Sequence, residues 1–279
     1  MKQRNQRNRI DHLLPQGYLE GFTDPDAPGT LSVFDIKKRR WFESGPPAVG
    51  ASRGYFDYFD YFDYSLESRP DQTADESFRR FEEDFPNVRR QMVAAGFTGW
   101  EQHLDFLLGY AQMLRARTQM FREQELKSFK GLELLRLKGP AAGEQSTFEY
   151  EPVPAEHRQE LYRNMAITKV REQIANGPSW FGNFRWFLRY SDALLSPVVT
   201  CDNPIIVSGP VHDAKSCVNH ENALIFFPLC WQACLIGSHV SCDPPTDIFD
   251  QRTLARIRSR YLTASCRFAY SPRRLDPLR

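Results

Sequence analysis

Three short segments of the chain carry polar side chains suited to acid–base chemistry or to the binding of an anion. The first holds His12, followed at close spacing by Pro15, Gln16 and Tyr18. Histidine titrates near neutral pH, so His12 is a candidate general base or metal ligand. The alternative is structural: a backbone carbonyl satisfies the His12 ring, and the segment anchors the N-terminal part of the chain to the core.

The second segment belongs to a long predicted helix. Between residues 99 and 129, apolar side chains recur at steps of three and four, which indicates one continuous helix. At 100° per residue, Arg115 and Arg122 lie in its apolar sector, and Gln112 borders that sector. A buried arginine needs an acceptor, either a carboxylate or the anion of a ligand. The preceding predicted helix offers three carboxylates: Glu76, Glu82 and Glu83.

The third segment is the run Cys201, Asp202, Asn203 and Pro204 at the end of a predicted strand. Aspartate, asparagine and proline favour turns, which is sufficient reason for the run. A carboxylate and an amide at the carboxyl end of a strand are also a common way to present a binding or catalytic site. The sequence leaves both interpretations open.

The elements that must position these residues predict an α+β fold, because helices fill the middle of the chain and strands dominate its last third. Residues 31–36 and 40–42 form an N-terminal hairpin, and capping signals begin a helix at residue 73 that ends near residue 85. A central helical bundle segment follows. After it we expect a mostly antiparallel sheet, a late helix over 250–263 and a closing strand at 267–270.

We predict that residues 1–279 form a single domain, with a basic arm at 1–9 and an aromatic repeat loop at 45–70. The repeat reads Tyr-Phe-Asp three times from Tyr55. Its rings could stack on nucleic-acid bases, but each aspartate repels phosphate. The alternative is a local sequence expansion in a loop.

The composition excludes a strong attraction of the whole protein to polyanions, because 36 lysines and arginines are balanced by 35 aspartates and glutamates. We expect the six cysteines to be reduced, and the spacing of Cys230, Cys234, His239 and Cys242 matches no common zinc pattern. No apolar run suggests a secretory signal or a membrane span. We therefore expect a cytoplasmic protein with no membrane partner.

Taken in order, these segments resemble the uncharacterised family called domain of unknown function 4238. The resemblance extends from His12 to about Tyr270 and also includes the segment Phe227-Pro228-Leu229. It gives weight to polar residues that match the family motifs, namely His12, Gln16, Arg117, Arg122, Asp202 and Asn203. Gln119 stands where the family tends to have proline, so we expect the long helix to continue through it.

These observations lead to a hypothesis in which the three segments converge on one polar pocket. The expected function is a hydrolase or nuclease-like enzyme acting on a phosphate-containing substrate, with nucleic acid or a nucleotide as partner. His12 and Asp202 would be catalytic, and a divalent metal ion is a possible cofactor. The expected substrate-binding set is Gln16, Tyr18, Gln112, Arg115, Arg117, Arg122 and Asn203.

The alternative is a binding or interaction module without enzymatic activity. In that version the same polar side chains form a buried structural network that joins the N-terminal segment to helix and sheet. Paired polar groups would favour the network, whereas an open cleft containing arginines would favour the enzyme. The substrate, the metal and the oligomeric state stay open.

Overall fold

The computed structural model describes residues 10–53, 74–129, 132, 134–138, 149–175, 181, 183–191, 196–208, 220–239, 249, 251–265 and 267–275. Helices and antiparallel sheets together confirm the predicted α+β class. The basic arm at 1–9 and the aromatic repeat at 55–64 lie outside the described residues. No helix within the described ranges has both the length and the apolar character of a membrane span.

The first four-stranded sheet combines strands from distant parts of the chain. The predicted N-terminal hairpin is confirmed as β2 (Leu31–Asp35) and β3 (Arg40–Ser44). It continues through β12 (Phe268–Ser271) to β8 (Thr200–Cys201), so the hairpin and the predicted closing strand share one sheet. This pairing places the Asp202 turn next to the start of β12, where the amide of Asp202 donates to the carbonyl of Phe268 (3.0 Å).

The second four-stranded sheet is the predicted late antiparallel sheet. Its order is β7 (Arg185–Tyr190), β11 (Ala233–Ser238), β10 (Leu224–Cys230) and β9 (Ile206–Ser208). Along β10, Ile225 and Phe227 belong to one core cluster, whereas the intervening Phe226 belongs to another. Because successive side chains of a strand point to opposite faces, both faces of this sheet are buried.

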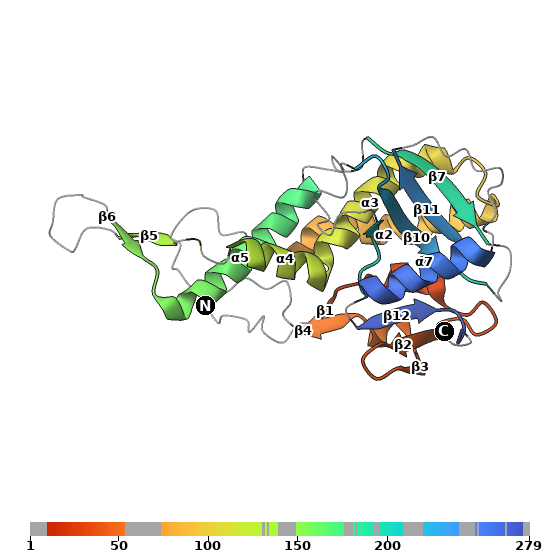
Figure 1. Ribbon diagram of the computed structural model, residues 1–279, viewed down its shortest axis with the longest axis horizontal. Helices are drawn as coiled ribbons and strands as arrows, with labels where there is room; N and C mark the ends of the chain where they lie inside the picture. Colours follow the sequence, from red (N-terminus) through yellow and green to blue (C-terminus); the bar gives the residue numbers. More distant parts are fainter. Residues whose placement is uncertain are drawn as a thin grey trace.

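Helices cover the two faces of the second sheet. Helix α7 (Gln251–Ala264) lies in front of it in Figure 1, and its Leu254, Ile257 and Tyr261 share a core cluster with Phe226. On the other face, α2 (Ala74–Ala94) and α3 (Leu104–Arg117) supply most of the helical residues in the larger cluster. Helix α5 (Ala155–Ala175) and the hairpin of β5 (Leu135–Lys138) and β6 (Glu149–Pro152) extend away from the sheets (Figure 1).

The prediction of one continuous helix over residues 99–129 is wrong. A 3-10 turn, η4 (Trp100–His103), precedes α3, and Thr118 separates α3 from α4 (Gln119–Phe129). Thr118 adopts an extended conformation, with φ −66° and ψ 148°. Its hydroxyl accepts the amide hydrogen of Phe121 (3.1 Å) and donates to the carbonyl of Arg115 (2.8 Å). Threonine is a favoured residue for capping the start of a helix, so the break needs no proline at position 119.

Helix α2 also differs from its prediction, because it continues to Ala94 through Pro86 instead of ending near Phe85. Proline removes one helical hydrogen bond, but this helix is held by its packing. Phe85 stacks on Tyr110 with ring centroids 3.9 Å apart, and both rings are buried. A Cβ atom on Gly17 would lie 2.6 Å from Cγ of Pro86, so the chain at Gly17 sits directly on the proline ring.

The predicted loop at 45–70 is more regular at its start than expected. It contains a 3-10 turn, η3 (Pro46–Ala48), and a short strand, β4 (Ala51–Arg53). Strand β4 pairs with β1 (Ile10–His12), the strand that carries the first candidate segment. This segment continues into helix α1 (Gln16–Leu19) and the 3-10 turn η2 (Glu20–Phe22). Residues 54–70 lie outside the described part.

Candidate functional site

The N-terminal segment is joined to α3 by the backbone of His12. The guanidinium of Arg117, a side chain that is 2% exposed, donates to the His12 carbonyl. The His12 ring is half-buried, and its Nε2 lies 3.0 Å from Nε2 of Gln16. In this contact the amide nitrogen of Gln16 is the donor and Nε2 of His12 is the acceptor.

Arg117 forms an ion pair with Glu82 of α2, and its guanidinium lies 4.3 Å from the ring centroid of Phe78. Carboxylates on the preceding helix were one of the two kinds of acceptor predicted for Arg115 and Arg122, the other being the anion of a ligand. In the structure Glu82 pairs with Arg117 instead. Arg117 therefore connects β1, α2 and α3, and these contacts support the structural network for this side chain.

Three other predicted site residues are buried and bonded within the fold. The Tyr18 hydroxyl donates to the carbonyl of Pro228 (2.9 Å), and burial raises the Tyr18 pKa well above its ordinary value. The Gln112 amide donates to Oε1 of Gln173 (2.7 Å). The Asn203 amide points at Sδ of Met120 (3.8 Å). These interactions hold α1, α3 and the 201–204 turn in place.

Asp202 positions the start of β12. Its Oδ1 accepts the hydroxyl hydrogen of Ser265 (2.9 Å), and its Oδ2 accepts the amide hydrogens of Arg267 (2.7 Å) and Phe268 (3.0 Å). A carboxylate that accepts backbone amides fixes the conformation of that backbone. The Arg267 guanidinium then lies over the Phe268 ring, with Cζ 4.6 Å from the ring centroid.

The three candidate segments meet at a cleft of about 430 Å³. Leu13, Leu14 and Gly50 line one side, α4 lines the second, and residues of the first sheet line the third. The lining residues with polar side chains are Gln119, Arg122, Glu123, Asp202, Arg267 and Tyr270. His12 directly precedes this lining in the chain but is not itself among the lining residues.

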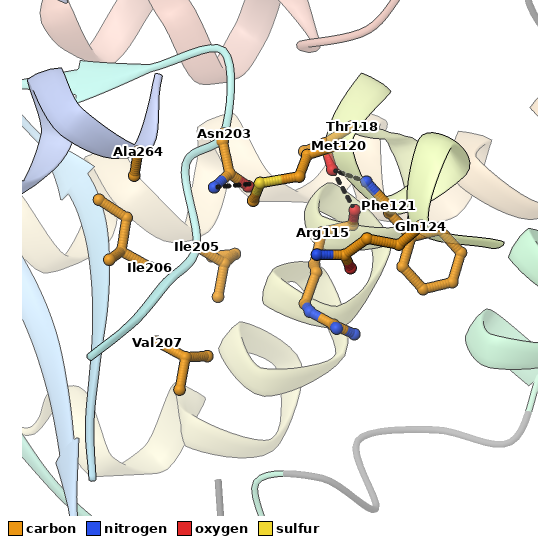
Figure 2. A pocket seen from close by; sticks show the side chains of 10 residues that line it. All are labelled: Arg115, Thr118, Met120, Phe121, Gln124, Asn203, Ile205, Ile206, Val207 and Ala264. Carbon is orange, nitrogen blue, oxygen red and sulfur yellow. Dashed lines mark hydrogen bonds between the residues drawn. The ribbon is translucent and has the colours of Figure 1, made fainter. Parts of the chain in front are cut away.

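A second pocket, of about 100 Å³, is lined by Arg115 of α3, by Thr118 and by residues of α4, among them Met120 and Phe121. Figure 2 shows Ile205, Ile206 and Val207 on one side, and Arg115 on the opposite side. Burial lowers the pKa of Arg115 to about 10. Its Cζ lies 5.4 Å from the ring centroid of Phe121.

The prediction that Arg115 and Arg122 lie in the same sector of one continuous helix is therefore wrong. The break at Thr118 changes the phase and direction of the helix, so Arg115 lines the small pocket and Arg122 the larger cleft. All three segments reach the larger cleft, but of the predicted site residues only Arg122 and Asp202 line it, whereas Arg115 and Asn203 line the small pocket.

Sequence reasoning did not identify Glu123, Arg267 and Phe268 as site residues. Glu123 neighbours Arg122, and its carboxylate accepts the Gln119 amide hydrogen (2.7 Å). In the sequence, Arg267 is recognisable only as a cation at the start of the predicted closing strand. Its proximity to residue 202 depends on the pairing of β12 with β8, which the local sequence does not reveal.

Metal binding remains a prediction. Among the described residues, no cluster of three or more His, Cys, Asp or Glu side chains could hold an ion. The possible zinc set includes Cys242, which lies outside those residues. Cys201, Cys230 and Cys234 are free thiols and are buried.

The family model described as "Protein of unknown function (DUF4238)" matches residues 11–273, and the chain belongs to this family. The match confirms the resemblance that the motifs indicated. No curated protein and no solved structure matches the chain.

Proposed function

We propose that this member of the DUF4238 family binds a phosphate-containing ligand in the cleft between the N-terminal segment, α4 and the first sheet. One observation carries the proposal: Arg122 and Arg267 reach the same cleft from α4 and from the start of β12. Guanidinium groups bind phosphate with two parallel hydrogen bonds, which favours arginine at phosphate sites.

The cleft is suited to a small ligand or to one unit of a larger ligand. Its volume of about 430 Å³ lies within the usual range for small-molecule sites. Leu13, Leu14 and Phe268 provide apolar walls, and the arginines provide the charges. Asp202 is already bonded to three donors, so we assign it the positioning of Arg267 and not contact with the phosphate.

Hydrolysis of the bound ligand is the second part of the proposal, and Glu123 supports it. Its carboxylate is exposed, lines the cleft and follows Arg122 in the sequence. A carboxylate beside a bound phosphate can accept a proton from an attacking water. His12 is the alternative base. Its Nε2 accepts from Gln16, so reaction through that nitrogen requires the Gln16 contact to open.

The test of binding is thermal unfolding with inorganic phosphate, nucleoside monophosphates and nucleoside triphosphates. A ligand present at 100 times its dissociation constant stabilises the native state by about 2.7 kcal/mol. Arg122→Gln should reduce affinity at least about 10-fold, because a hydrogen bond to a charged group contributes about 1.5–3 kcal/mol.

Lys127→Gln is the matched control, since Lys127 is exposed on the same helix and does not line the cleft. Equal loss of affinity in both variants, or no stabilisation by any of these phosphates, would contradict binding at Arg122. Hydrolysis is measured as product release with and without Mg²⁺ or Mn²⁺. Glu123→Gln should retain binding and lose turnover, and His12→Gln is assayed beside it. If Glu123→Gln turns over normally, Glu123 is not the base.

A further inference from the structure

A group of exposed cations lies beside the cleft at one end of the first sheet. The turn between β2 and β3 contains three of them, and Arg40 begins β3. With the exposed Arg267 they form a surface that we call the basic rim: Lys37, Lys38, Arg39, Arg40 and Arg267.

The strand register places these cations together. Asp35 pairs with Arg40 on β3 and with Phe268 on β12. The amide of Ile36 donates to the carbonyl of Arg267 (2.9 Å), so the turn begins next to Arg267. Two segments separated by more than 200 residues of sequence therefore contribute to one basic surface.

Two carboxylates at this end of the sheet are directed to the backbone. Asp35 is 3% exposed, and its Oδ1 accepts the amide hydrogen of Lys38 (2.9 Å). Asp202 accepts the amide hydrogens of Arg267 and Phe268. Both carboxylates shape the rim, and the cationic side chains of the rim remain at the surface. A surface of this kind attracts polyanions even though the chain as a whole is nearly neutral.

The rim is continuous with the cleft, because Arg267 belongs to both. A linear polyanion that follows the rim would therefore bring one of its phosphates to Arg267 and Arg122. Aromatic side chains accompany the cations: Trp41 follows Arg40, and its ring packs 5.1 Å from that of Phe34. Trp41 is half-buried, so part of its surface can contact the bases of a single strand.

An anionic membrane is a weaker explanation of the rim. Peripheral membrane surfaces combine cations with apolar side chains that enter the interface. The exposed large hydrophobic residues in the described part of the chain are Val93 and Leu132, and neither belongs to the rim. Cations with adjacent aromatic rings are more typical of single-stranded nucleic-acid binding.

We propose that the basic rim binds the backbone of a single-stranded nucleic acid and guides one phosphate into the cleft. The second half of this statement rests on the proposed function, whereas binding at the rim does not.

The test is fluorescence anisotropy with a labelled 20-nucleotide strand of DNA or RNA over a range of salt concentrations. The rim variant carries Lys37→Gln, Lys38→Gln, Arg39→Gln and Arg40→Gln and leaves the cleft residues intact. We expect affinity to fall at least about 10-fold at low salt. The slope of log K against log salt should decrease by up to about 3, since each contact with a single strand contributes about 0.7.

The control variant removes four exposed charges elsewhere, at Arg79, Arg80, Arg90 and Arg185. Unchanged binding by the rim variant overturns the proposal, as does an equal loss in the control variant. Binding to vesicles that contain phosphatidylserine, without binding to either oligonucleotide, also overturns it and identifies a membrane surface. Thermal unfolding of both variants without ligand shows whether they are folded.

The outcomes separate the two proposals. Oligonucleotide binding that depends on the rim, together with no stabilisation by small phosphates, retains the rim and rejects the proposed cleft function. Stabilisation by small phosphates that depends on Arg122, together with rim-independent oligonucleotide binding, retains the cleft function and rejects the rim.

Discussion

The ion pair between Arg117 and Glu82 should respond unequally to removal of its two partners. Arg117 is 2% exposed, whereas the Glu82 side chain is 33% exposed. Removing Glu82 leaves a buried cation without its carboxylate, and breaking a buried pair in this way costs about 3 kcal/mol. Removing Arg117 leaves a carboxylate that water can already reach. The smaller cost then comes mainly from the His12 carbonyl, which loses a donor worth about 1 kcal/mol.

The variants are Glu82→Ala, Arg117→Met and the double variant, studied by urea unfolding and thermal unfolding. For 279 residues the unfolding entropy is about 0.6 kcal/mol per kelvin, so 3 kcal/mol lowers the Tm by roughly 5 °C. Methionine retains contact with Phe78 and has no charge to bury. The double variant should therefore be more stable than Glu82→Ala alone.

Glu83→Ala is the matched control, because Glu83 is the next residue of α2 and pairs with Arg79 at the surface. Such exposed pairs contribute about 0.5 kcal/mol or less. The reasoning is refuted if Glu82→Ala and Glu83→Ala are equally stable, or if the effects of Glu82→Ala and Arg117→Met simply add.

Three further predictions concern packing, capping and pH. Gly17→Ala should destabilise the protein by about 1–3 kcal/mol in urea unfolding, because the new methyl group would overlap Pro86. Gly96→Ala is the comparison, since Gly96 has a positive φ and open space around it, so that its methyl group adds backbone strain without an overlap. Thr118→Val should cost about 1–2 kcal/mol through loss of the cap, whereas Thr118→Ser should retain most of the stability in the same assay. Burial raises the pKa of Cys234, so the unfolded chain loses this proton at lower pH than the native protein. Stability should accordingly fall as pH rises above about 9, and Cys234→Ala should reduce that slope in a series of Tm measurements; an unchanged slope would exclude Cys234 as the cause.

Local signals predicted most elements, because each depended on residues that are neighbours in sequence. The β2–β3 hairpin, α7, β12 and the presence of a late antiparallel sheet follow from periodicity and turn residues. The failures occurred where a contact overrode the local pattern. Thr118 caps α4 within an otherwise helical stretch, and α2 continues through Pro86 because the segment at Gly17 packs on it.

The candidate site could be predicted only in part, for the same reason. The motif residues identified three segments that do meet at the cleft. Their side chains nevertheless differ in environment: Tyr18 and Arg117 are buried within the fold, whereas Arg122 reaches the cleft. Residue type and spacing do not distinguish these two outcomes. Arg267 joined the site through pairing between remote strands, which a single sequence does not encode in a readable local pattern.

The strand pairing of the first sheet has a consequence for biosynthesis. β2 is completed at Asp35, but its partner β12 begins only at Phe268, about 230 residues later. At translation rates of 5–20 residues per second, β2 waits roughly 10 to 50 s for this partner. During that interval one edge of the hairpin lacks its native partner and is open to wrong strand pairing. The nascent chain is therefore expected to gain the cleft and the complete basic rim together, in a late step that follows the emergence of β12 from the ribosome.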